Sequence, residues 1–164
     1  MNAVKTGIVA ALLFFVFKLI LFFSNLQHKI LADFPIAPLL ITTFIGIVYI
    51  ILKFRNSGRF DVAGAFKEGG KVALVSALLS SFLVYFYYTG IDPDFLEILK
   101  IEKLKLASTL TDTKALENYK KATEFFNSAS TRSLFTLSGM TVFGLISSLI
   151  IALLTNAMLV NKSR

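Results

Sequence analysis

Residues 134–160 read LFTLSGMTVFGLISSLIIALLTNAMLV and contain no charged side chain. An α-helix rises 1.5 Å per residue, so about 20 residues cross the ~30 Å hydrocarbon core of a membrane, and this run exceeds that length. Its apolar residues are continuous rather than alternating, which favours a helix over a barrel strand as the means of satisfying the backbone in lipid. The run therefore predicts a membrane-spanning helix.

Three further apolar runs precede it, at residues 4–23, 36–54 and 72–88. The first has Lys5 at its start and is broken by Lys18, and the second contains no charge until Lys53. The second and third are near the lower length limit, and a small tilt or local thinning of the bilayer accommodates them. We therefore expect four spans, with residues 1–164 forming a single membrane domain.

The composition of the whole chain agrees with this reading. Its 164 residues are 55% hydrophobic and only 16% charged, and the mean hydropathy is +0.73, whereas soluble domains carry about 25% charged residues. These values exclude a soluble globular enzyme and a disordered tail, and the absence of cysteine excludes a disulfide-stapled secreted module. The predicted fold class is an all-α integral membrane four-helix bundle.

Basic residues predict the orientation of the spans. The loop between the second and third spans is rich in Lys and Arg, whereas the link between the first and second has only His28 and Lys29 as basic side chains. Lys5 and the basic tail fall on the same side as the basic loop. Because cytoplasmic loops carry the excess of Lys and Arg, we expect both termini and the middle loop to lie in the cytoplasm. The net charge of +7 then mostly serves to orient the spans in the membrane. The sequence has no basic patch interleaved with aromatic residues, so it does not predict a nucleic-acid partner.

The segment before the third span shows a short amphipathic pattern. Phe60, Ala63 and Phe66 recur at three-residue spacing, and Gly69-Gly70 follows them. We expect a short helix over Phe60–Glu68 and an elbow at the two glycines. This helix is either a simple positive-inside anchor or a surface that binds anionic lipid.

Residues 92–127 predict an extracytoplasmic helical insert between spans three and four. Asp92-Pro93-Asp94 has the residue types of a helix start, and a second helix is expected from Thr113 to Asn127 after a break at 108–112. In the second helix an apolar stripe predicts an interaction face, and the opposite side pairs Glu117 with Lys121 and Lys120 with Glu124. The stripe contains Leu116, Tyr119, Thr123 and Phe126. Its partner is the first helix, the lipid interface or another protein.

Three ionisable residues are candidate functional groups. Lys18 is the only one inside a predicted span, and a lysine there either serves a function or extends its stem so that the ammonium reaches the outer surface. Asp92 and Asp94 are candidate paired carboxylates, with helix capping as the alternative role.

The sequence contains no recognisable catalytic constellation. His28 is the only histidine and there is no cysteine, so a zinc site lacks its ligands and a serine nucleophile lacks a base. The glycines at 64, 69 and 70 do not match a phosphate-binding loop. We therefore predict that the protein is not an enzyme and has no catalytic, cofactor-binding or metal-binding residues.

Small residues recur at four-residue spacing in every predicted span, as in Gly7 with Ala11, Thr42 with Gly46, and Gly144 with Ser148. Such spacing lets helix backbones approach closely in lipid. It predicts tight packing within the bundle, or a face for a homo-oligomer.

Three stretches resemble a family of small bacterial inner-membrane proteins that is classed as a domain of unknown function and occurs mostly in Bacteroidetes-type bacteria. They are Phe60–Gly69, with Ala65-Phe66-Lys67 at its centre, Ile91-Asp92-Pro93-Asp94-Phe95, and Phe143–Ile150. The resemblance implies four spans and a charged helical insert before the last one. It implies no activity, cofactor or catalytic residue.

The functional expectation is a non-enzymatic structural or interaction protein, such as an accessory subunit of a membrane assembly that presents the insert to a partner. The alternative is a small transporter or channel, motivated by Lys18 and the hydroxyl-bearing third and fourth spans. The expected partners are the lipid bilayer and a membrane protein or a second copy of the chain.

Overall fold

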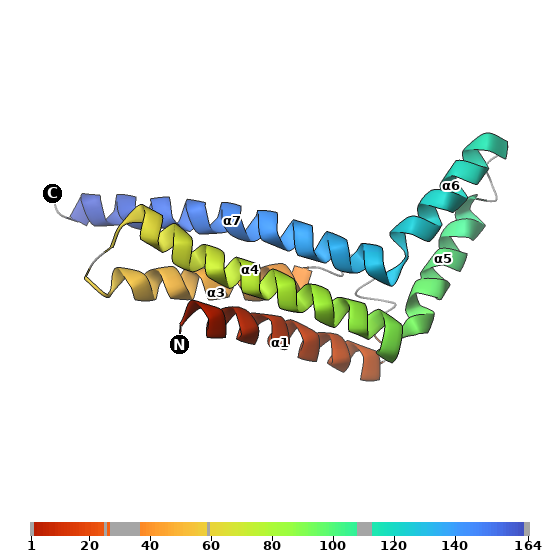
Figure 1. Cartoon of the computed structure of the whole chain (residues 1–164), viewed down its shortest axis with the longest axis horizontal. Coiled ribbons are helices and arrows are strands. Elements are labelled where there is room, and N and C mark those ends of the chain that lie inside the picture. Colours follow the sequence, from red (N-terminus) through yellow and green to blue (C-terminus); the bar gives the residue numbers. More distant parts are fainter. Residues whose placement is uncertain (1, 25, 27–36, 59, 108–112, 163–164) are drawn as a thin grey trace. The chain divides into compact units, whose positions relative to one another are not determined.

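The computed structural model describes residues 2–24, 26, 37–58, 60–107 and 113–162 (Figure 1). Within these ranges the chain is helical, with short connections and no strand. The elements are α1 (Ala3–Phe23), α3 (Ala37–Arg55), α4 (Val62–Phe86), η1 (Tyr87–Ile91), α5 (Pro93–Ala107), α6 (Thr113–Phe126) and α7 (Ala129–Lys162). The predicted all-α class is confirmed.

Four of these helices are long and apolar enough to cross a membrane. They are Ala3–Phe23, Ala37–Arg55, the continuous α4–η1 segment Val62–Ile91, and Ala129–Asn161. The four predicted spans are therefore confirmed, and the chain is a multi-pass membrane protein. The third and fourth are longer than expected because helical structure continues past the uncharged runs at their ends.

The described chain divides into two compact units. Unit 1 comprises residues 1–80 and 136–164, and unit 2 comprises residues 81–135. Unit 1 contains α1, α3, most of α4 and most of α7, and its core joins Ile47 and Ile51 of α3 to Val72 of α4 and Ala152 of α7. The spans thus pack through small and branched apolar side chains, as expected for helices in lipid.

Glycines allow the helices of unit 1 to approach closely. A Cβ atom at Gly7 of α1 would lie 2.8 Å from the Val72 carbonyl oxygen of α4, and one at Gly144 of α7 would lie 3.2 Å from Ala73 Cα. The buried hydroxyls of Thr43 on α3 and Ser76 on α4 share a 2.8 Å hydrogen bond. The packing role predicted for the small residues is confirmed at these positions.

The helix expected over Phe60–Glu68 is present from Val62 on, but the elbow expected at Gly69-Gly70 was wrong. Helix α4 begins at Val62 and continues without a break to Phe86. Its start is fixed by Asp61, whose Oδ1 accepts a 2.6 Å hydrogen bond from the Gly64 amide. A Cβ at Gly69 would lie 2.8 Å from Ser148 Oγ of α7, so this glycine serves helix packing instead of chain reversal. As a result Glu68 belongs to the same continuous helix as the third span.

Unit 2 contains the end of α4, η1, α5, α6 and the start of α7. Ser81 and Ser133 join α4 to α7, because their hydroxyls lie 2.8 Å apart and each also donates to the other residue's carbonyl oxygen. The two predicted insert helices are confirmed as α5 and α6, although the break expected at 108–112 lies outside the described residues. The π-helical turn η1 was not predicted.

Candidate functional site

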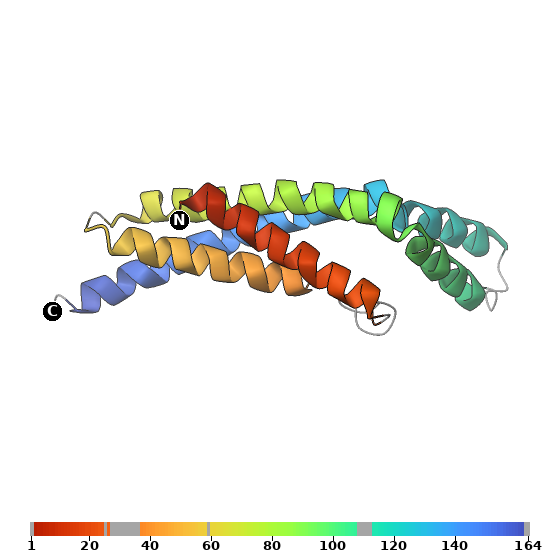
Figure 2. The ribbon, with the colours of Figure 1, turned by 90° about the horizontal axis from the view of Figure 1, so that it is seen from below.

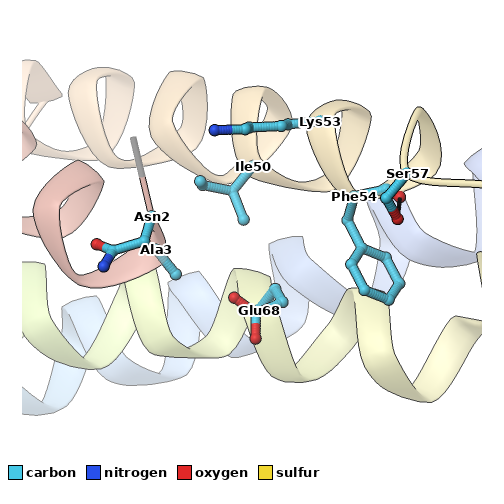
Figure 3. Close-up of a pocket in the computed structure, with 7 residues that line it drawn as sticks. All are labelled: Asn2, Ala3, Ile50, Lys53, Phe54, Ser57 and Glu68. Carbon is cyan, nitrogen blue, oxygen red and sulfur yellow. Dashed lines mark hydrogen bonds between the residues drawn. The ribbon is translucent and has the colours of Figure 1, made fainter.

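The first candidate site is a hollow of about 280 Å³ in unit 1, where α1 begins and α3 ends (Figure 3). In Figure 3 Ile50 and Glu68 point toward one another across the hollow, and the Lys53 side chain extends along α3. The lining residues are Asn2, Ala3, Ile50, Lys53, Phe54, Ser57 and Glu68. The hollow therefore combines an apolar floor with polar groups.

Charged side chains of α3 and α4 lie around this hollow. Glu68 forms an ion pair with Lys71, three residues further along α4, at 2.5 Å. Lys53 is the positively charged side chain among the lining residues. Asn2 caps α1, because its Oδ1 accepts a 2.9 Å hydrogen bond from the Lys5 amide. The arrangement is suited to an anionic group next to an apolar body.

A second hollow of about 210 Å³ lies between α1 and α3. Figures 1 and 2 show these two helices side by side and antiparallel. The hollow is lined by Thr6, Val9, Ala10, Leu13, Thr42, Ile45, Gly46 and Tyr49. Its walls are mainly aliphatic.

A polar cluster occupies the interior of unit 2 around η1. Asp92 is buried, and its Oδ2 accepts a 3.1 Å hydrogen bond from the hydroxyl of buried Tyr87. Tyr88 packs edge-on against Tyr87 and stacks on Phe95 with ring centroids 5.7 Å apart. Asp92 is thus held inside the unit, whereas Asp94 is exposed in the first turn of α5. The structure does not bring the two predicted carboxylates together as a pair.

Two cations of unit 2 converge on one amide oxygen. Asn127 Oδ1 accepts hydrogen bonds from Lys103 Nζ at 3.3 Å and from Arg132 Nη2 at 3.0 Å. Burial, and secondarily the charge of Arg132, lower the pKa of Lys103. Because the folded state disfavours the charged lysine, this cost is present at neutral pH. It disappears as the pH rises from the lowered pKa toward the ordinary value of 10.5.

Lys18 lies in α1 and is only 2% exposed. The side chain also takes part in an interaction. Its burial shows that Lys18 packs against other parts of the protein, whereas the choice between a functional lysine and one whose ammonium reaches the membrane surface stays a prediction. The sequence shows the charge within a span, but only packing decides whether that charge faces lipid or protein.

The residues of the predicted interaction face of α6 differ in exposure. Tyr119 and Phe126 are exposed, Leu116 is half-buried and Thr123 is buried. Phe126 stacks on Phe135 of α7, with ring centroids 5.7 Å apart. The Glu117–Lys121 pair is confirmed at 2.7 Å, whereas Glu124 lies 4.0 Å from Lys100 of α5. Helix α6 thus turns Thr123 and Asn127 inward and leaves aromatic side chains outside.

Both hollows and the Tyr87–Asp92 pair were missed by sequence reasoning. Each depends on residues from different helices or from opposite ends of an irregular turn. The tyrosine-rich run Tyr85–Tyr88 next to Asp92 was the available signal for the buried pair. His28 lies outside the described residues.

The fold and these sites define an α-helical multi-pass membrane protein built on four apolar helices. Over residues 3–156 the chain matches the family model described as "Protein of unknown function (DUF4199)", and it belongs to that family. No curated protein and no solved structure matches the chain. The resemblance to a domain of unknown function is confirmed.

Proposed function

We propose that this protein is a non-enzymatic interaction protein of the bacterial cytoplasmic membrane. In this proposal the α5–α6 segment is presented outside the membrane to a protein partner, as in an accessory subunit of a membrane assembly. Both chain termini lie in the cytoplasm. The orientation is supported by the basic residues between spans two and three, which include Lys53, Arg55 and Lys71.

One observation carries the proposal, namely the exposed aromatic side chains of α6. Phe125 and Phe126 are 59% and 50% exposed, and Tyr119 is also exposed. Exposed apolar side chains on the four spans face lipid, whereas α6 has only 14 residues and carries charges of both signs, so it does not span the membrane and its aromatics are accessible to a protein partner. Aromatic residues are enriched at protein interfaces and often supply most of the binding energy.

The test is site-specific photo-crosslinking in native membranes. We expect a photoreactive phenylalanine at Tyr119 or Phe125 to form an adduct with one defined protein. The same probe at Asn118 or Lys120, also exposed on α6, serves as the matched control and should give little of that adduct. In the variant Phe125→Ser the recovered partner should fall at least tenfold, as for an interface hot spot.

Two outcomes would contradict the proposal. One is equal labelling from all four positions, which would indicate random collisions. The other is an adduct containing only a second copy of this chain, which would make α6 a homo-oligomer face instead of a docking surface for an accessory subunit.

A further inference from the structure

The two hollows of unit 1 lie on successive turns of the same helix pair. On α1, Asn2 lines the first hollow, and Thr6, Val9 and Leu13 line the second. These positions are separated by four, three and four residues, so they form one stripe along the helix. The hollows therefore follow one another along α1.

Helix α3 shows the same continuity in the opposite direction. Thr42, Ile45 and Tyr49 line the second hollow, and Lys53 lines the first one turn beyond Tyr49. Because a helical side chain leans toward the N-terminus of its helix, Lys53 extends back over the Tyr49 turn. The seam between α1 and α3 is thus a single track with an ammonium group at one end.

Away from the Lys53 end, the track is mainly apolar. The Thr6 hydroxyl donates to the Asn2 carbonyl oxygen at 3.0 Å, and the Thr42 hydroxyl donates to the Leu39 carbonyl oxygen at 3.1 Å. Each threonine is therefore satisfied by its own helix and presents mainly its methyl group elsewhere. Val9 and Ile45, on opposite walls, are exposed on helices that span the membrane. This part of the seam opens to hydrocarbon.

We propose that the α1–α3 seam binds one glycerophospholipid, with its phosphate beside Lys53 and an acyl chain between Val9 and Ile45. The proposal goes beyond the docking role of α6 and does not depend on it. Charge and polarity select this occupant. A phospholipid has one anion at the end of an apolar chain, and the seam has a cation at the end of an apolar track. Glu68 does not oppose the phosphate strongly, because Lys71 neutralises it.

The experiment measures lipid binding to the purified, delipidated full chain by native mass spectrometry. The probes are phosphatidylglycerol, phosphatidylethanolamine, diacylglycerol of the same chain length, and glycerol 3-phosphate. We expect both phospholipids to bind at least fivefold more tightly than diacylglycerol. Glycerol 3-phosphate, which has the phosphate but no chain, should bind weakest.

Matched variants test the two ends of the track. Lys53→Gln should weaken phospholipid binding about five- to tenfold, the size expected for one charge-assisted hydrogen bond. Lys67→Gln, which removes an exposed lysine from the first turns of α4, should change it less than twofold. Val9→Trp should weaken binding of every lipid, whereas Ile8→Trp, at an exposed position about 100° around α1 from Val9 that lines neither hollow, should not.

Ile45→Trp repeats the steric test from the opposite wall, and retained helix content shows that each variant is folded. The proposal is overturned if Lys53→Gln and Lys67→Gln have equal effects, because the charge would then act non-specifically. It is also overturned if neither tryptophan weakens binding, or if glycerol 3-phosphate binds as tightly as the phospholipids.

Discussion

Ser76 and Ser80 lie one turn apart on α4, and both side chains are fully buried. Ser76 is hydrogen-bonded to Thr43 across the α3–α4 contact. Ser80 Oγ, in contrast, has no hydrogen-bond partner among the described residues. A buried hydroxyl without a partner costs free energy, whereas a satisfied one contributes modestly to stability. The side chains of Ser76 and Ser80 are therefore expected to have opposite effects on the stability of the folded protein.

We expect Ser80→Ala to raise the free energy of unfolding by about 1 kcal/mol and Ser76→Ala to lower it by about 1 kcal/mol. The first substitution removes an unsatisfied group, and the second leaves Thr43 without its partner. Unfolding in mixed detergent micelles measures both values, and each variant is the control for the other. Equal destabilisation by the two substitutions would contradict this assignment.

Helices α4 and α7 approach each other through Gly69 and Gly144. A Cβ at Gly144 would lie 3.2 Å from Ala73 Cα, and one at Gly69 would lie 2.9 Å from Ser148 Cβ. Both approaches are too close for an added side-chain atom, so the backbones themselves form the contact. Gly139, also on α7, has no neighbour within 4 Å of such an atom among the described residues. The two glycines of α7 therefore have different roles.

Gly144→Ala should destabilise the protein by about 1–3 kcal/mol, because the methyl group overpacks against Ala73. Gly139→Ala should instead stabilise it by about 0.5–1 kcal/mol, because alanine is the better helix former and space is available. Thermal unfolding of the two variants in detergent measures the difference. A loss of stability at Gly139 as large as that at Gly144 would show that helix propensity and packing have been misassigned.

At the scale of the whole molecule, four apolar spans alternate with charged connections. The charge of these connections is the basis for the proposed orientation of the protein in the membrane. The basic residues Lys53, Arg55 and Lys71 lie in or near the α3–α4 connection in the sequence. By the positive-inside rule we propose that this connection lies in the cytoplasm, and that four single crossings leave the α5–α6 segment outside.

Because the chain has no cysteine, single cysteines report the orientation without background. We expect Ser57→Cys and Asn161→Cys to resist a membrane-impermeant maleimide in intact spheroplasts, whereas Glu117→Cys is labelled. All three positions are exposed, so each should react after the membrane is permeabilised, which is the internal control. Labelling of Ser57→Cys before permeabilisation would reverse the proposed orientation.

Local sequence patterns were sufficient for the elements but not for their contacts. Pro93 and Asp94 correctly predicted the start of α5, since a proline and an acid in the first turn favour helix initiation whatever the surroundings. The elbow predicted at Gly69-Gly70 was wrong, because here the local pattern depends on the surroundings. An isolated glycine pair is typical of a turn, and only the proximity of Ser148 explains why it lies inside a helix.

The sequence by itself determined that the chain crosses a membrane through four helices, because span length and continuous hydrophobicity are properties of consecutive residues. It also determined that a pair of helices precedes the last span. Only the tertiary structure decided that Lys18 is buried, that Asp92 meets Tyr87, and that α1 and α3 leave two hollows between them. The physical reason is that burial and cavities depend on the close packing of residues distant in sequence, which hydrophobic periodicity does not encode.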